Sequence, residues 1–330
     1  MTIYDIAKEA GVSITTVSRV INQKPGIKEA TRVRVQEVLD KYHYLPSPSA
    51  KGLAAKKSGT IALLTEDVRD VHYSHTVFTV EQELSKKGYN CLLMNTGTDR
   101  EQRVECMERA MQNQVEGVVL IGSTFEEKYI QKAITRYLPN TPVVMANAYL
   151  DLPNVCGILC DGRKGMEDAV TYLAEKNLKK IAYVGDNDNV SARAKKQGYL
   201  DGMKKCGLKD SEVVWKAKRG MEDGGIRTRE LLEQHPETEA IIYEEDLIAI
   251  GGMNEMMKMG VAVPGQVSVI SFDDSVYAKI ATPQMSSIDD KLDVMGIKCA
   301  QTMTDMLEGT ALISQMVLIP ELVIRKSCIL

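Results

Sequence analysis

A short stretch near the N-terminus carries the clearest chemistry in this sequence. Residues 14–22 read ITTVSRVIN, in which Val17, Val20 and Ile21 recur at the spacing of one buried helix face. The opposite face then presents short groups and one long cation: Ile14, Thr15, Thr16, Ser18, Arg19 and Asn22. An arginine can donate two hydrogen bonds to guanine, and hydroxyl groups can meet phosphates or base edges, when a helix lies in the major groove. We therefore predict that this face contacts duplex DNA.

The residues around this stretch predict the motif that positions it. An apolar face at helical spacing indicates an earlier helix over 2–11, and another helix is expected over 27–45. Gly11 suits the backbone of a tight turn, and Ser13 suits the N-cap of the second helix. Helix, turn and helix predict a helix-turn-helix motif in a compact three-helix head. A plain amphipathic helical hairpin would show the same apolar spacing, so this alternative stays open on the pattern alone.

The charge distribution favours the DNA-binding interpretation of the head. The chain of 330 residues has a formal net charge of −4, but residues 1–57 contain ten Lys and Arg against five Asp and Glu, which is +5. The remaining residues contain 31 basic against 40 acidic side chains, which is −9. A basic head on an acidic body is typical of a polyanion-binding module joined to a domain that does not itself bind nucleic acid.

The rest of the chain predicts an α/β fold. Apolar runs that suit strands covered on both faces alternate with amphipathic helical stretches, as in a doubly wound parallel sheet. The expected strands are 60–65, 90–95, 117–122, 142–147, 156–161, 180–185, 240–243 and 267–272. So many units predict two doubly wound lobes, with a cleft between the carboxyl ends of their strands. We expect a head at 1–46, a hinge at 47–58 with linker composition, and a two-lobed body at 59–330. Its first lobe would span about 59–160 and 290–318, and its second about 161–289 and 319–330.

Several segments resemble the LacI/GalR family of bacterial transcription regulators. The opening TIYDIAKEAGVSITTVSRVIN is similar to the family's head, AKGLAAKKS resembles its hinge, and VAVPGQVSVISFDD and IPELVIRKS resemble stretches of its sensor. The resemblance covers essentially the whole chain. It implies a sequence-specific regulator, expected to be a repressor, on a body of the periplasmic-binding-protein type. It also implies that Ile14, Thr15 and Arg19 contact bases while Thr16, Ser18 and Asn22 lie near the backbone, and the predicted DNA-contacting set is completed by Thr2, Tyr4, Ser13, Lys51, Leu53 and Ala54.

The resemblance gives Leu53 in the hinge a particular role. In the family, the matching leucine and its symmetry mate wedge into the minor groove and kink the DNA, which costs a few kcal/mol of unstacking and gains protein contact. The alternative for Leu53 is a linker residue that docks on the body. Lys51 stands where the family often has arginine, which weakens the expected minor-groove contact. Since one head buries little surface, we expect a homodimer on a pseudo-palindromic operator.

The resemblance also implies a ligand pocket between the lobes. The residues that it places there are Asp70, His72, Tyr73, Asn147, Asp161, Arg193, Lys195, Asp246 and Asp273. Carboxylates, cations and an aromatic ring would suit a sugar or a related metabolite, although each residue could instead cap a helix or form a surface ion pair. Lys195 and Glu245 depart from residues that sugar-binding members often carry. An alternative is control by a phosphocarrier protein, as in the branch that resembles catabolite control protein A.

Other function classes find little support in the sequence. The pattern contains no phosphate-binding GxxxxGK[ST] loop, no GxSxG elbow and no HExxH motif, so we predict neither catalysis nor a cofactor. Seven scattered cysteines predict free thiols, and His72 and His75 are expected to be loop histidines rather than metal ligands. The charged N-terminus and the absence of long apolar runs predict a cytoplasmic chain without membrane contact. A solute-binding protein is the alternative from a different class, and it would need a signal peptide.

Overall fold

The computed structural model describes residues 2–44, 58–185, 189–311 and 313–329. Their contacts divide the chain into two compact units, at 1–59 and 60–330. Lys51, Leu53 and Ala54 of the predicted hinge lie outside the described residues. In the described part of the chain, no helix combines the length and the apolar character that crossing a membrane requires.

The described residues 2–44 of the smaller unit form three helices with a core of their own. These helices are α1 (Ile3–Ala10), α2 (Ile14–Ile21) and α3 (Glu29–Lys41). Their apolar faces meet in one cluster of fully or nearly fully buried side chains: Ile6, Ala7, Ala10, Val17, Val20, Val35 and Leu39. This cluster includes the apolar positions that the helical spacing of the sequence selects in the first two helices.

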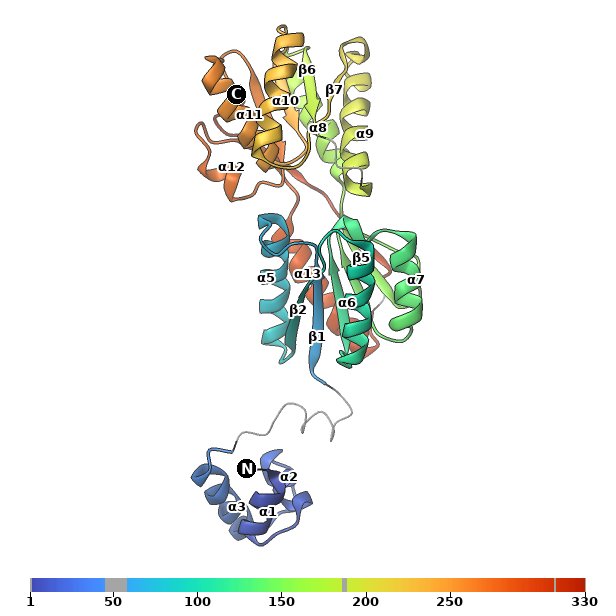
Figure 1. Ribbon diagram of the computed structural model, residues 1–330, viewed down its shortest axis with the longest axis vertical. Helices are drawn as coiled ribbons and strands as arrows, with labels where there is room; N and C mark the ends of the chain where they lie inside the picture. The colour runs from blue at the N-terminus through green and yellow to red at the C-terminus, as the bar shows by residue number, and fades with distance from the viewer. Residues whose placement is uncertain (1, 45–57, 186–188, 312, 330) are drawn as a thin grey trace. The chain divides into compact units, whose positions relative to one another are not determined.

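The larger unit contains two six-stranded sheets, each with helices on both faces (Figure 1). The first sheet is parallel throughout, in the order β11 (Gln315–Leu318), β5 (Val155–Cys160), β4 (Val143–Ala146), β3 (Gly117–Ile121), β1 (Thr60–Thr65) and β2 (Asn90–Asn95). The second has the order β12 (Glu321–Val323), β10 (Ser286–Asp289), β9 (Ser268–Phe272), β8 (Ala240–Tyr243), β6 (Ile181–Val184) and β7 (Val213–Trp215). Each sheet with its helices forms one lobe, which confirms the predicted α/β class.

Successive side chains of each buried strand point to opposite faces of the sheet, so both faces are apolar and both are covered by helices. In β1, Ile61 and Leu63 enter one apolar cluster while Ala62 and Leu64 enter the other, as the two-residue period of a strand requires. The first lobe's helices are α5 (Val71–Lys86), α6 (Arg100–Gln112), α7 (Lys128–Tyr137) and α13 (Leu292–Glu308), with the short η1 (Ser123–Phe125). The second lobe's are α8 (Gly162–Glu175), α9 (Val190–Lys205), α10 (Met221–Gln234), α11 (Asp246–Met259) and α12 (Val276–Ile280), with η2 (Lys209–Ser211).

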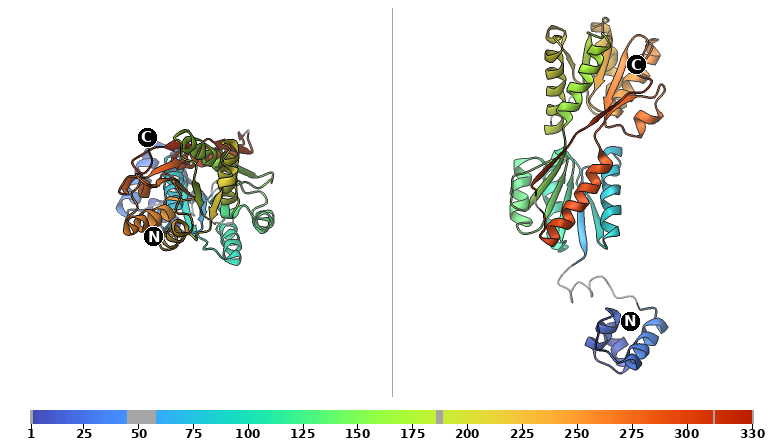
Figure 2. Two further views of the ribbon diagram at one scale, coloured as in Figure 1. Left: turned by 90° about the horizontal axis from the view of Figure 1, so that it is seen from above. Right: turned by 180° about the vertical axis from the view of Figure 1, so that it is seen from behind.

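The chain passes between the two lobes three times. It leaves the first sheet after β5, returns after β10 to form α13, and crosses again between β11 and β12. Helix α13 therefore packs beside α5 in the first lobe although more than 200 residues separate them (Figure 2). These crossings bring side chains from distant segments to the region between the lobes.

Three sequence-based expectations about the elements were wrong. Strands β7, β10, β11 and β12 did not appear among the expected strands, because each has only three or four residues and the last three include polar side chains. Strand β12 pairs antiparallel with β10, so the second sheet is mixed rather than fully parallel. His72 and His75 lie in the first turns of α5, which begins at Val71 after the N-cap Asp70, and not in a loop.

Candidate functional site

The turn of the head is built from the residues that the sequence indicates. Gly11 ends α1 with φ 63°, a left-handed backbone that glycine adopts without strain. Ser13 caps α2: its hydroxyl oxygen accepts a hydrogen bond from the amide of Thr16 at 3.2 Å. Val17 and Val20 turn into the head's core, so the opposite side of α2 faces outward.

The outward face of α2 carries the predicted base-contacting residues. Ile14, Thr15, Arg19 and Asn22 are exposed, as is Ser13, whereas Thr16 and Ser18 are half-buried. No described residue forms an ion pair or a hydrogen bond with the Arg19 guanidinium, which leaves its donors available for a ligand. The amide of Asn22 donates to the carbonyl oxygen of Ser18 at 2.8 Å and so caps the helix end.

The two predicted contacts at the start of the head differ in availability. Tyr4 is 68% exposed. Thr2 takes part in a capping box with Asp5, in which its backbone amide donates to the Asp5 carboxylate at 2.8 Å. Thr2 therefore fixes the start of α1, and its remaining exposed surface is what a phosphate could reach.

A small polar pocket lies between the lobes of the larger unit. Its volume is about 50 Å³, and its lining includes five of the predicted effector residues: His72, Tyr73, Asn147, Lys195 and Asp273. Asp70 and Asp246 line a neighbouring pocket of about 90 Å³, and Asp161 and Arg193 line neither. Asp161 instead caps α8, accepting from the amide of Lys164 at 3.0 Å, and Arg193 is exposed on α9.

Sequence reasoning missed Arg219, which links the two lobes. Its guanidinium contacts Asp70 of the first lobe at 2.6 Å and Glu245 of the second at 2.9 Å. It also lies over the ring of Tyr73, 5.6 Å from the centroid. Burial raises the pKa of Glu245 to about 8, and the nearby Arg219 offsets this only in part. Arg219 lies just before α10 in a segment without apolar periodicity, so no local pattern indicates it.

Lys195 is a buried cation on α9. Its ammonium donates to the backbone oxygen of Glu244 at 3.0 Å, lies 3.7 Å from Asp273, and lies 3.8 Å from the centroid of the Phe272 ring. Burial opposes its charge, but Asp273 and the other nearby carboxylates outweigh burial and raise its pKa. Lys195 is therefore a charged donor in the lining of the pocket.

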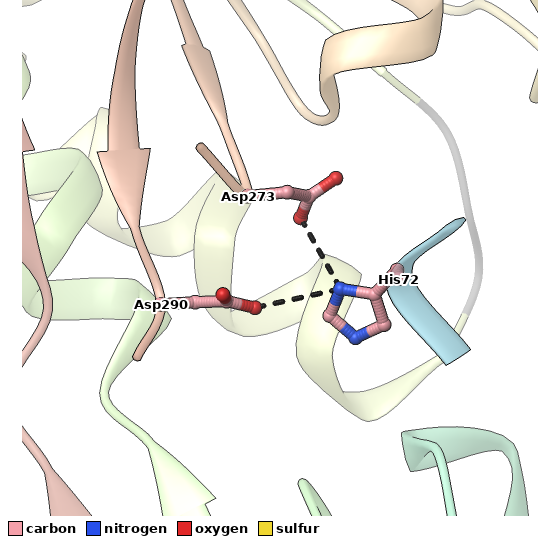
Figure 3. Close-up of side chains that lie close together, drawn as sticks. All are labelled: His72, Asp273 and Asp290. Carbon is pink, nitrogen blue, oxygen red and sulfur yellow. Dashed lines mark ion pairs between the residues drawn. The ribbon is translucent and has the colours of Figure 1, made fainter. Parts of the chain in front are cut away.

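Asp290 is a second group that the sequence did not indicate. It follows β10, and Asp273 follows the neighbouring parallel strand β9, so both carboxylates lie at the same sheet edge. Figure 3 shows both side chains turned toward the ring of His72, whose Nδ1 is 3.5 Å from Asp290 and 3.8 Å from Asp273. Burial raises the pKa of both carboxyls, whereas burial and the nearby Lys195 lower the pKa of His72.

Asp246 lines the second pocket, but its carboxylate already accepts hydrogen bonds from serines. One oxygen accepts from the hydroxyls of Ser271 and Ser287, the latter at 2.8 Å, and the other accepts from the amide and the hydroxyl of Ser275, both at 2.7 Å. Burial raises its pKa to about 6, with Asp273 adding to the rise and the serine hydrogen bonds opposing it. Asp246 therefore joins the ends of the strands that carry the pocket.

Comparisons with known proteins decide the family. Residues 2–47 match the model for bacterial regulatory proteins of the lacI family, and residues 170–328 match that for a periplasmic binding protein-like domain. Catabolite control protein A of Streptococcus mutans is 31% identical over 311 residues, covering 93% of this chain and 91% of that protein. The chain belongs to the LacI family.

Solved structures of transcription regulators have the same fold. A lac repressor dimer bound to operator and an anti-inducer matches with a TM-score of 0.91 at 22% identity, over 99% of this chain and 98% of that one. The complex of the transcriptional regulator CelR with cellobiose matches with a TM-score of 0.72 at 25% identity, over 99% of both chains. As a LacI-family protein, this chain is a DNA-binding transcriptional regulator, and its relatives are regulators rather than enzymes.

Proposed function

We propose that this LacI-family regulator binds a pseudo-palindromic operator as a homodimer and that a small polar metabolite in the cleft controls the binding. The observation that carries the proposal is the outward face of α2, where Arg19 is exposed without a partner among the described residues. Because a single head offers little surface, two heads related by symmetry supply the affinity of a regulator. We assign residues 47–58 the role of the linker between head and body.

The pocket supports a ligand rich in hydroxyl groups. Asn147, Lys195 and Asp273 offer donors and acceptors at its wall, and Tyr73 offers an aromatic edge. The cellobiose complex of CelR makes a carbohydrate the first class to test. A cavity of about 50 Å³ holds only a few water molecules, so a sugar requires the lobes to move apart before they close on it.

The test is to titrate the protein into DNA from the region upstream of its own gene. Fluorescence anisotropy of the labelled DNA reports the binding. We expect tight binding to a duplex with two half-sites, and weakening of that binding as salt rises, because Lys and Arg release counterions from phosphates. Addition of sugars from a carbohydrate panel should shift the affinity. Equal affinity for a single asymmetric half-site, or only sequence-independent binding at every salt concentration, would contradict the proposal.

Leu53→Ala tests the linker role separately. If Leu53 wedges into the minor groove, the variant should bind the operator more weakly and keep its affinity for the cleft ligand. Operator affinity is measured by anisotropy and ligand affinity by thermal shift on the same preparation. An unchanged operator affinity would reject the wedge.

A second candidate keeps the DNA-binding function but replaces the metabolite with a protein. The 31% identity to a catabolite control protein A favours it. On this hypothesis, a phosphorylated phosphocarrier protein would raise operator affinity in the anisotropy assay, whereas carbohydrates alone would not.

A further inference from the structure

The three side chains of Figure 3 have the spacing of metal ligands. One ligand atom from each of His72, Asp273 and Asp290 lies within 4.8 Å of the others. Metal–ligand bonds to imidazole and carboxylate are about 2.0–2.2 Å long, so two donors on one ion lie at most about 4.4 Å apart. The distances from Nδ1 of His72 to the carboxylates, 3.5 and 3.8 Å, already meet this limit. A cation at this point needs only a small closure of the carboxylate pair.

Two of these side chains hold buried atoms without a partner. The side chain of Asp290 is 2% exposed, and among the described residues its Oδ1 has no hydrogen-bond donor. Nδ1 of His72 is also buried without a hydrogen bond from the described part of the chain. Buried polar atoms are nearly always satisfied, so unpaired atoms on two side chains that face each other require an explanation such as a bound ion. Oδ2 of Asp290 is the oxygen 3.5 Å from Nδ1, and a cation between the two side chains would engage Nδ1 and a carboxylate oxygen of Asp290.

The local charge balance points the same way. The acidic side chains around the two pockets outnumber the three cations, Arg69, Lys195 and Arg219. The acidic side chains are Asp70, Glu244, Glu245, Asp246, Asp273 and Asp290. Arg69 is paired with Asp67. Arg219 is held by Asp70 and Glu245, and Lys195 lies beside Asp273. No described Lys or Arg forms an ion pair with Asp290. Since an unpaired buried carboxylate is costly, this position favours an added positive charge.

We propose that His72, Asp273 and Asp290 bind one divalent transition cation that joins the two lobes. One imidazole nitrogen with two carboxylates suits Mn²⁺ or Zn²⁺ better than Mg²⁺ or Ca²⁺, which prefer all-oxygen sites. His72 belongs to α5 of the first lobe, Asp273 follows β9 of the second, and Asp290 starts the crossing to α13. The ion therefore holds the lobes together at the wall of the cleft, and the adjacent cavity admits water to complete its coordination.

The test is calorimetric titration of the chelator-treated full chain with MnCl₂, ZnCl₂ or MgCl₂. We expect one site per chain for Mn²⁺ and Zn²⁺ and far weaker binding of Mg²⁺. His72→Ala and Asp290→Asn should each weaken binding by on the order of 100-fold. His75→Ala is the matched control: His75 lies on the same helix but is 45% exposed and pairs with Asp293 at 2.7 Å, so its loss should leave the affinity unchanged.

A spectroscopic measurement makes the test independent of folding. In the Mn²⁺-loaded chain, electron spin echo spectra should show modulation from a coordinated ¹⁴N, and His72→Ala should lose it while retaining the native circular dichroism. The proposal is overturned if neither Mn²⁺ nor Zn²⁺ binds at millimolar concentration, or if His75→Ala loses as much affinity as His72→Ala. It is also overturned if spermidine, an organic polycation, binds at this site and the metals do not. No DNA is present, so this outcome is separate from that of the operator titration.

Discussion

At the scale of single residues, Arg19 is the side chain whose chemistry is most specific. It stands on an outward helix face with its donors free of described partners, and a bidentate pair with guanine distinguishes that base from the others. We expect Arg19→Ala to reduce discrimination at one base pair per half-site by about 1–3 kcal/mol. The measurement is anisotropy against operators with each base substituted in turn. Arg34→Ala, on the exposed side of α3, is the control. It should change the affinity for all operator sequences equally or for none of them.

Glu245 gives a second prediction at this scale, on pH. Its pKa in the folded chain is raised to about 8, above the 4.5 of a free carboxyl. The folded state thus holds a proton that the unfolded state has already released. The stabilisation is therefore complete below pH 4.5 and is lost as the pH rises toward 8. Glu245→Gln should remove this decline in the free energy of unfolding, which is on the order of 5 kcal/mol across the window.

The fluorescence of Trp215, the chain's single tryptophan, follows urea unfolding of the second lobe at each pH. Glu233→Gln serves as the control because its side chain is 59% exposed. A parallel decline with pH in the Glu245 variant and the unchanged chain would contradict the assignment.

At the scale of elements, Asp246 holds together the strand ends that carry the pocket. Its carboxylate accepts from serines that follow or belong to β9 and β10. Asp246→Ala leaves several buried donors without an acceptor, each costing about 1–3 kcal/mol. We expect a loss of about 3 kcal/mol in the stability of the second lobe, measured by urea unfolding. Asp168→Ala is the control because it removes only a surface pair with Lys164, and it should change the free energy of unfolding by at most about 0.5 kcal/mol. An equal loss of stability in both variants would show that the serine contacts contribute little.

At the scale of the whole molecule, the face proposed to bind DNA and the cleft proposed to bind the ligand belong to separate compact units. If the cleft ligand changes operator affinity by some factor, thermodynamic linkage requires the operator to change ligand affinity by the same factor. We expect equal factors when each titration is repeated at saturating concentrations of the other partner. Unequal factors would mean that the two titrations report different binding events.

The sequence by itself determined the local parts of this protein. Gly11, Ser13 and the apolar spacing of α2 predict the head because caps, turns and helical periodicity are set by near neighbours in the chain. The buried runs of β1 and β3 predict the parallel sheet for the same reason. The resemblance to the LacI family added residues such as His72 and Asp273, which the structure does place in one pocket.

Only the tertiary structure decided which distant groups meet. Arg219 pairs with Asp70, about 150 positions earlier, and Asp290 faces His72 because the chain crosses between the lobes three times. Asp161 and Asp246 carry a suitable carboxylate, yet one caps a helix and the other is bound by serines. Such contacts depend on how the strands are ordered in space. The type of a side chain and the local sequence pattern around it do not determine that order.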